Sequence, residues 1–508
     1  MNRRIGVIMS GLLMVFEMLS TLLYTPYLIR TLGQSEYGVY TLVFSITAYL
    51  TLLDLGVGNA VVRYVSKYRV DGAYEEQRHF LGVAVGYYGV IAAVALLVGA
   101  VIILFFPNLF AKGLAASEIV LAKKLMTITV LNIGVTLATS PYMYILTAYE
   151  KFFMSKGISI IQVVFKMAVC TLVLYLGMGS VGVVLVNFIL TFLLRFAIVA
   201  YVSFGLKLRP KFAKTSAKFI KSIAGYSSWI LLQMIATQIN QMADQVLIGM
   251  FAASSSVILG VYGVGAQINQ YFQSVGSAFT GVLMPGVVKI VEKDGSAQVL
   301  QKEMERIGRI VLMVTAFIWC VFLVCGEQFV SLWAGAENVR AYWVALLLMA
   351  PQVFILAQSV GAQILWAMEK HRFQAVLKFI IVLVNVFLTI FLIKIWDPLL
   401  GATVGTFISL VLGDIVVMQI VFKKDIGIQL LPYYKNLLRG ILPCLLFSLL
   451  AGFAVKYFLP VSGWFGFILN GGTMVLVYGA TMLWFGMNSY EKQLLFSPIQ
   501  KAMQHIRK

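Results

Sequence analysis

The chain alternates long apolar segments with short polar connections. About fourteen of these segments reach the length that a helix needs to cross a bilayer, which is about 20 predominantly apolar residues. The first two are expected at residues 5–29 and 37–60, and the last two at 440–459 and 466–487. No connection between them is long enough to fold into a soluble domain. The pattern therefore predicts an all-α polytopic membrane protein with about fourteen transmembrane helices.

The segment from Tyr226 to Met250 differs from an ordinary spanning helix because one of its faces is polar. At helical spacing this face carries Gln233, Thr237, Asn240, Gln241 and Asp244. The next segment repeats the pattern with Gln267, Gln270, Ser274 and Ser277. Acids and amides at membrane depth are costly unless they face water or find partners. We therefore expect these two helices to line one water-filled transport cavity.

Composition supports the membrane assignment and argues against catalysis. Hydrophobic residues make up 61% of the 508 and charged residues only 12%, whereas soluble domains carry about 25% charged residues. The four cysteines lie in apolar segments without the spacing of metal ligands, and the three histidines lie apart from any acid cluster. No glycine-rich Walker loop is present. The sequence predicts no metal site, no cofactor and no enzymatic activity.

The net charge of +19 is interpreted through the positions of the basic residues. If the N-terminus is cytoplasmic, most of the 39 lysines and arginines fall in cytoplasmic connections, and only Lys166, Arg195 and Lys378 are embedded. This asymmetry predicts that both termini are cytoplasmic. It also accounts for the charge without a nucleic-acid partner.

An internal repeat divides the chain. Residues 145–151 match residues 364–370 at an offset of 219, and the same offset carries Gly182 onto Gly401. The repeat predicts a six-helix lobe at 1–204, a basic cytoplasmic linker at 205–222 and a second six-helix lobe at 223–425. Two further helices and a cytoplasmic tail would then occupy 426–508. Because each lobe holds an even number of helices, the lobes would share one orientation.

Several motifs resemble those of a known family. They are Tyr24-Thr-Pro-Tyr-Leu-Ile-Arg-Thr-Leu-Gly, Glu36-Tyr-Gly-Val-Tyr, Leu53-Asp-Leu-Gly-Val-Gly-Asn-Ala-Val-Val-Arg63-Tyr and Asn240-Gln-Met-Ala-Asp244-Gln-Val-Leu-Ile-Gly249. They are similar to motifs of polysaccharide-biosynthesis flippases of the Wzx type, within the multidrug/oligosaccharidyl-lipid/polysaccharide exporter superfamily. The resemblance implies two lobes that alternate access and carry an undecaprenyl-diphosphate-linked oligosaccharide from the cytoplasmic to the outer leaflet. It further implies a bacterial cytoplasmic membrane protein, favoured as a monomer, that works beside glycan-assembly enzymes.

Such a substrate needs cations for its diphosphate and polar groups for its glycan. Arg30, Lys166 and Arg195 are the candidate cations, together with the amides Gln233, Asn240, Gln241, Gln267 and Gln270. Arg30 lies at the outer end of its helix, where it either faces the cavity or snorkels to the surface. Arg195 and Asp414 are related by the repeat offset, so each either contacts substrate or pins its own lobe through a buried pair. Lys378 lies near a helix end and is expected to snorkel.

Embedded acids are candidates for coupling transport to protons or sodium, because burial favours the neutral form of a carboxyl group. Glu17, Asp54 and Asp244 are the three candidates. Each could instead be a hydrogen-bonded structural acid. Asp54 precedes Leu-Gly-Val-Gly, where small residues would allow close helix packing.

Two alternative functions remain open from the sequence. A cation-coupled multidrug exporter of the same superfamily would favour acids and aromatic residues in its cavity, which Glu17 and Asp244 would suit. A membrane-embedded enzyme of envelope-glycan assembly would need an acid, base or metal constellation near the outer surface, and none is found. The embedded cations favour the flippase.

Overall fold

The computed structural model describes residues 2–54, 57–212, 217–293, 295–368 and 370–496, so parts of the predicted linker and tail lie outside the described residues. Seventeen α-helices and no strand occur in those ranges. The helices of the first half are α1 (Asn2–Ala48), α2 (Gly58–Val70), α3 (Tyr74–Phe110), α4 (Ala116–Ala148), α5 (Phe152–Tyr175), α6 (Gly179–Ala200), α7 (Ala217–Phe251) and α8 (Ser255–Lys293).

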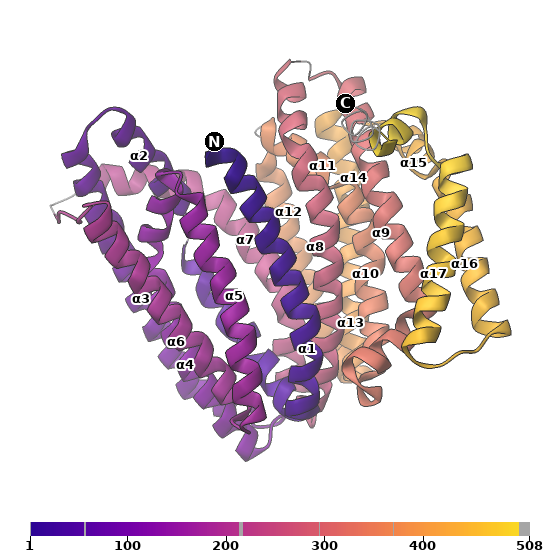
Figure 1. Cartoon of the computed structure of the whole chain (residues 1–508), viewed down its shortest axis with the longest axis horizontal. Coiled ribbons are helices and arrows are strands. Elements are labelled where there is room, and N and C mark those ends of the chain that lie inside the picture. Colours follow the sequence, from indigo (N-terminus) through magenta and orange to yellow (C-terminus); the bar gives the residue numbers. More distant parts are fainter. Residues whose placement is uncertain (1, 55–56, 213–216, 294, 369, 497–508) are drawn as a thin grey trace, which may run out of the picture. The chain divides into compact units, whose positions relative to one another are not determined.

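The remaining helices are α9 (Ala297–Ala334), α10 (Ala341–Ala357), α11 (Ser359–Ala367), α12 (His371–Ile395), α13 (Pro398–Ser409), α14 (Met418–Val421), α15 (Leu430–Leu438), α16 (Ile441–Phe458) and α17 (Gly463–Thr481) (Figure 1). Short π-helical segments extend several of them, including Tyr201–Gly205 after α6 and Leu410–Val417 after α13. The all-α membrane fold predicted from the sequence is therefore confirmed.

The structure accounts for only part of the predicted number of membrane spans. Ten helices in the described ranges are long and apolar enough to cross a membrane, and α10 with α11, bent by 45°, would add an eleventh if the pair is a single span. One of the ten, Met9–Asp54, covers both of the first two predicted segments. It contains a break at Gly33, whose φ of 72° is a left-handed value that glycine adopts without strain. The count of fourteen stays a prediction.

The chain forms two compact units. The first contains residues 1–263 and 386–402, and the second contains residues 264–385 and 403–508. Their borders therefore differ from those of the predicted lobes, because the contacts group α7 and the start of α8 with the first six spans. The repeat is nevertheless visible in the helix starts. Phe152 of α5 and His371 of α12 are 219 residues apart, as are Gly179 of α6 and Pro398 of α13.

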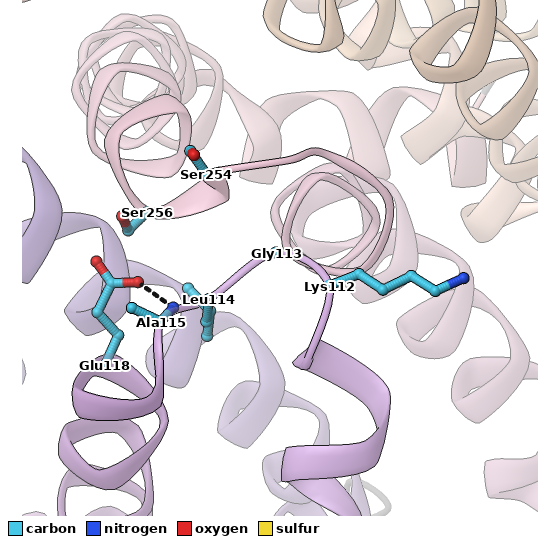
Figure 2. A pocket seen from close by; sticks show the side chains of 7 residues that line it. All are labelled: Lys112, Gly113, Leu114, Ala115, Glu118, Ser254 and Ser256. Atoms are coloured by element: carbon cyan, nitrogen blue, oxygen red, sulfur yellow. Dashed lines mark hydrogen bonds between the residues drawn. The ribbon is translucent and has the colours of Figure 1, made fainter.

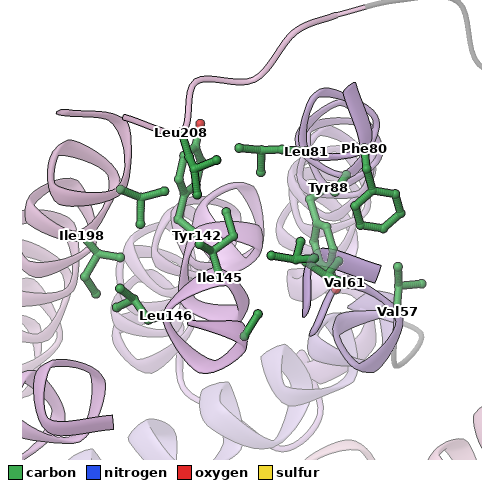
Figure 3. Packing of buried hydrophobic residues seen from close by; sticks show 14 residues of the cluster. Val57, Val61, Phe80, Leu81, Tyr88, Tyr142, Ile145, Leu146, Ile198 and Leu208 are labelled. Carbon is green, nitrogen blue, oxygen red and sulfur yellow. The ribbon is translucent and has the colours of Figure 1, made fainter. Parts of the chain in front are cut away.

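An apolar cluster in the first unit joins the ends of four helices. It contains Val57, Val61, Val65, Phe80, Leu81, Ala84, Tyr88, Tyr142, Ile145, Leu146, Ala148, Ile198, Val202 and Leu208, contributed by α2, α3, α4, α6 and the segment after α6 (Figure 3). The α2 residues recur every four positions, which places them on one helix face. This cluster holds the short helix α2 against the longer helices.

In the second unit, one arginine ties the last two long helices to α9. The buried Arg309 of α9 pairs with the buried Glu491 at 2.7 Å. It also donates to the backbone carbonyls of Asn436 and Arg439 near the end of α15, and to that of Gly486 after α17. Because these carbonyls end helical segments, the guanidinium satisfies acceptors that have no partner within their own helices.

Candidate functional site

Asp244 is the most deeply buried of the three predicted coupling acids, with 2% of its surface exposed. Tyr262 of α8 donates its hydroxyl to one carboxylate oxygen at 2.5 Å, and the Thr389 hydroxyl of α12 lies 3.5 Å from the other. All three residues belong to the first unit. Hydroxyls beside a buried carboxylate can stabilise its charge, and their oxygens can join it in binding a small cation. This cluster is therefore chemically able to hold a proton or an alkali ion.

Asp54 lies in a 3₁₀ turn, Tyr49–Asp54, and is held by two phenols. The fully buried Tyr88 of α3 donates its hydroxyl to one carboxylate oxygen, and Tyr144 of α4 donates to the other at 2.9 Å. Arg195 of α6 interacts electrostatically with Tyr144. The arrangement ties α3 and α4 to the turn. This arrangement fits the alternative in which Asp54 is a hydrogen-bonded structural acid.

Lys166 lies deep in α5. The helix spans Phe152–Tyr175, so Lys166 is about 21 Å from its first residue and about 14 Å from its last at 1.5 Å per residue. That depth opposes snorkelling to either end. The neighbouring polar groups are the Cys170 thiol, one helical turn further along, and the phenols of Tyr24 and Tyr40 in α1, which interact with Cys170.

Neither Lys166 nor Arg195 pairs with a carboxylate in the part of the chain that the structure describes. Both are half-buried and belong to the first unit. A cation that is partly removed from water without an acid partner carries a desolvation cost, and an anionic ligand would offset that cost. These two side chains are therefore the candidate anion-binding groups.

Asp414, the repeat equivalent of Arg195, is in a different situation. Lys378 of α12 lies 3.5 Å from its carboxylate, so the two charges neutralise each other within the second unit. Gln358 donates to the Asp414 backbone carbonyl and accepts from Gln419. The alternative in which Asp414 pins its own lobe is the one observed. Lys378 was expected to snorkel, and it instead forms this pair.

The other predicted site residues are more exposed. Glu17 and Arg30 of α1, Gln241 of α7 and Gln270 of α8 are exposed, whereas Gln233, Asn240 and Gln267 are half-buried. Gln267 and Gln270 belong to the second unit and the remaining five to the first. A cavity shared by the polar faces of α7 and α8 stays a prediction.

A small pocket lies in the first unit at the connection between α3 and α4. Lys112, Gly113, Leu114, Ala115, Glu118, Ser254 and Ser256 line it (Figure 2). Glu118 accepts from the Ala115 backbone amide at 2.8 Å and from the Ser35 hydroxyl at 2.5 Å. Because the carboxylate caps the start of α4 and binds Ser35, it joins that end of α4 to α1 just beyond the break at Gly33. The pocket contains none of the predicted site residues.

The tyrosines that hold the buried acids are not among the site residues predicted from the sequence. Tyr88, Tyr144 and Tyr262 lie inside apolar segments, where a phenol needs a hydrogen-bond partner. A tyrosine within an apolar segment therefore indicates a buried hydrogen bond. The sequence does not identify its partner, because the partner lies in another segment of the chain. No group of three or more histidine, cysteine or acidic side chains suited to a metal ion occurs among the described residues.

Comparison with known proteins identifies a family and a fold. The sequence model of a family described as "Polysaccharide biosynthesis protein" matches residues 4–291, more than half of the chain. No match to a curated protein was found at the sequence level.

Two solved structures with a similar fold have the titles of transporters. One, "Lipid II flippase MurJ, inward closed conformation", has a TM-score of 0.72 at 16% identity and covers 97% of this chain and 99% of that one. The inward-facing conformation of a multidrug resistance MATE family transporter of the MOP superfamily has a TM-score of 0.63 at 10% identity, covering 80% of this chain and 96% of that one. At these identities the similarity is one of fold.

Proposed function

Because the chain belongs to the polysaccharide biosynthesis protein family, we propose that it is a secondary transporter of a lipid-linked glycan. It would move an undecaprenyl-diphosphate-linked oligosaccharide from the cytoplasmic to the outer leaflet by alternating access, for export of a cell-surface polysaccharide. The fold shared with a protein titled as a lipid II flippase supports a lipid-linked substrate. The family supports a glycan rather than a drug.

The observation that carries the proposal is the pair of cations without carboxylate partners among the described residues, Lys166 and Arg195. A diphosphate presents several anionic oxygens, and charge-assisted hydrogen bonds to ammonium and guanidinium groups are about twice as strong as neutral ones. Drug cations would instead be repelled by these groups. The proposed roles are therefore phosphate contacts for Lys166 and Arg195, while Arg30, Gln233, Asn240, Gln241, Gln267 and Gln270 serve the rest of the head group.

The energy for transport would come from a proton or sodium gradient acting at Asp244. Its carboxylate is buried and surrounded by the hydroxyls of Tyr262 and Thr389, which suits exchange of one small cation at a time. Glu17 is exposed and Asp54 is held by two phenols, so both are weaker candidates for coupling.

The proposed setting is the bacterial cytoplasmic membrane, with both termini cytoplasmic. The excess of lysine and arginine in the connections assigned to the cytoplasm supports this orientation. Reporter fusions within residues 205–222 test it, because an outer location of that segment would reverse the topology. We propose a monomer that receives its substrate from glycan-assembly enzymes.

The decisive experiment is to extract undecaprenyl-diphosphate glycans from a strain that lacks the protein and to determine which leaflet holds them. We expect one complete repeat unit to accumulate on the cytoplasmic face, because synthesis continues while translocation stops. Complementation with the wild-type chain should empty this pool, and a Lys435→Ala variant, altered at an exposed lysine of α15, should do the same.

Two outcomes would overturn the proposal. An unchanged glycan pool together with altered sensitivity to cationic drugs would indicate the multidrug exporter. Accumulation of an incomplete or unpolymerised glycan on the outer face would indicate an assembly step after translocation, as expected of an envelope-glycan enzyme.

A further inference from the structure

The short helix α2 is amphipathic and carries basic residues on the face away from the protein. Val57, Val61 and Val65 are buried in the apolar cluster of Figure 3. Arg63 and Lys67 are exposed, about half a helical turn away from that buried stripe. Analysis of hydropathy alone does not detect this helix, because only one of its faces is apolar.

Two contacts fix α2 rigidly to the helices beneath it. Gln77, buried at the start of α3, donates to the Val65 carbonyl at 3.0 Å and accepts from the Tyr149 hydroxyl at 3.0 Å. Arg69 donates to the Ala148 carbonyl at the end of α4 and lies 4.6 Å from the centre of the Tyr149 ring. The outward face of α2 is therefore held in one orientation.

The packing also sets the level of α2 along the spanning helices. The apolar cluster that receives α2 contains Ile145 and Leu146, at the end of α4, and Ile198 and Val202, at the end of α6. Helix α6 has 22 residues, or about 33 Å at 1.5 Å per residue, which nearly equals the hydrocarbon thickness of about 30 Å. A helix packed on its last turn lies at the level of the lipid head groups.

The segment after α6 adds to the same surface. Leu208 is buried in the apolar cluster, and the Lys211 amide donates to the Arg78 carbonyl of α3 at 3.0 Å. A Cβ atom on Gly82 would come within 2.3 Å of the Lys211 carbonyl oxygen, so the segment runs directly along α3. This contact places Lys207 and Arg209, both exposed, beside the first turns of α3, against which α2 also packs.

We define the α2 face as Arg63, Lys67, Lys207 and Arg209, four exposed cations that pair with no carboxylate in the described ranges. Glu75 is occupied by Arg78 and Lys211, while Asp71 and Glu76 are exposed nearby. Exposed apolar side chains lie among the cations: Val70 is 86% exposed, Phe204 69% and Phe212 70%. Cations interspersed with exposed apolar residues are characteristic of surfaces that bind the bilayer interface.

We propose that the α2 face is a docking surface for anionic phospholipid head groups. The cations would contact head-group phosphates while Val70, Phe204 and Phe212 enter the upper acyl region. A soluble acidic protein would match the charge but would leave the exposed Val70 and Phe212 unexplained, whereas the Phe204 ring already lies 5.2 Å from the Arg209 guanidinium. The inference depends on the membrane fold and is independent of which glycan is carried.

The test is a lipid-competition measurement on the full chain in vesicles of phosphatidylcholine and phosphatidylglycerol. A thiol-reactive fluorophore on Val70→Cys reports from the α2 face, and labelling is selective because all four native cysteines are buried. Quenching by phosphatidylglycerol with a spin-labelled head group is compared with quenching by the matching phosphatidylcholine. The ratio gives the preference of the site for the anionic lipid.

We expect the preference to exceed one, to fall at high salt, and to fall about fivefold for each basic residue removed. Arg63→Gln with Lys67→Gln should lower it about 25-fold, since the two effects multiply. Lys207→Gln with Arg209→Gln is a second, independent pair in case the α2 variant fails to fold. Lys112→Gln with Lys435→Gln removes the same charge elsewhere on the exposed surface and should leave the preference unchanged.

Three results would overturn the inference. The first is a preference of one in the wild-type chain, and the second is an equal loss in the control pair. The third is a fluorophore that responds to soluble polyglutamate but not to phosphatidylglycerol, which would assign the surface to an acidic protein partner.

Discussion

The two units differ in the partners of their charged side chains. In the second unit, Lys378 meets Asp414 and Arg309 meets Glu491, so each cation has an acid beside it. In the first unit, Asp54 and Asp244 are held by hydroxyls. The first-unit cations, Lys166 and Arg195, have no such acid partner among the described residues. Paired charges stabilise a structure only modestly but are costly to separate. The second unit therefore uses its charges to fix its architecture, whereas the first leaves its cations available for an anion.

The largest effect on stability is expected from removing Arg309, which joins several segments of the second unit. Arg309→Met removes the cationic partner of the buried Glu491, which still accepts from the Asn488 amide, and several backbone carbonyls lose their donor. We expect the free energy of unfolding to fall by about 3–5 kcal/mol. Denaturant unfolding in detergent, followed by tryptophan fluorescence, measures the change.

Arg306→Met is the comparison variant, because Arg306 is a half-buried arginine of the same helix that pairs with Glu303 one turn away and lies 3.8 Å from the centre of the Tyr490 ring. A partly exposed pair of this kind contributes at most about 1 kcal/mol, and a cation–π contact about as much. If the two variants were equally stable, Arg309 would not hold the second unit together.

The cations of the first unit should matter for transport rather than for stability. Lys166→Met and Arg195→Met are each expected to slow glycan export about tenfold or more, because a charge-assisted hydrogen bond contributes about 1.5–3 kcal/mol. Their unfolding midpoints should not fall, since neither residue has an acid partner to leave unpaired in the described structure. The initial rate of export in complemented cells measures the effect.

The paired charges of the second unit provide the contrast. The double variant Lys378→Met with Asp414→Leu removes both charges together and should retain most of the export rate. Export at the wild-type rate by Lys166→Met, or a tenfold loss in the double variant, would reverse the assignment of roles between the units.

Asp244 and Asp414 test which acid couples transport to an ion gradient. Asp244→Asn should lower gradient-driven export several-fold and leave the remainder insensitive to collapse of the proton and sodium gradients. Tyr262→Phe, which removes one donor to the carboxylate, should give a smaller loss of the same kind. Asp414→Asn should keep its gradient dependence because its partner is Lys378.

Export rates measured with and without each gradient separate these cases. Normal gradient dependence in Asp244→Asn would exclude this carboxylate as the coupling group. Loss of gradient dependence in Asp414→Asn would move the coupling site to the second unit.

The smallest expected effect concerns Asp54. Tyr144→Phe removes one of two phenol donors and should cost about 1 kcal/mol of unfolding free energy without changing export. Tyr175→Phe, at an exposed tyrosine of α5, serves as the control and should cost nothing measurable. A change in the ion dependence of export in Tyr144→Phe would instead make Asp54 part of the coupling machinery.

The sequence by itself determined the class of the fold, the family and the internal repeat. These depend on local patterns: runs of apolar residues long enough to span a bilayer, and motifs such as Asn240-Gln-Met-Ala-Asp244. The same offset of 219 separates the starts of α5 and α12 and those of α6 and α13 in the structure. Each of these signals lies within one segment or between two aligned segments, so it can be detected before the chain folds.

Only the tertiary structure decided which charges meet. Arg195 and Asp414 are equivalent in the repeat, yet Asp414 pairs with Lys378, which lies 36 residues earlier. Arg195 instead interacts with the phenol of Tyr144 and pairs with no carboxylate among the described residues. Helix α2 was not predicted because it has only 13 residues and is apolar on only one face. Such a segment does not resemble a membrane-spanning helix. The partner of a buried polar group is set by the packing of helices that are distant in sequence, and the cost of leaving such a group unpaired selects among those packings. That cost appears only once the helices are in contact.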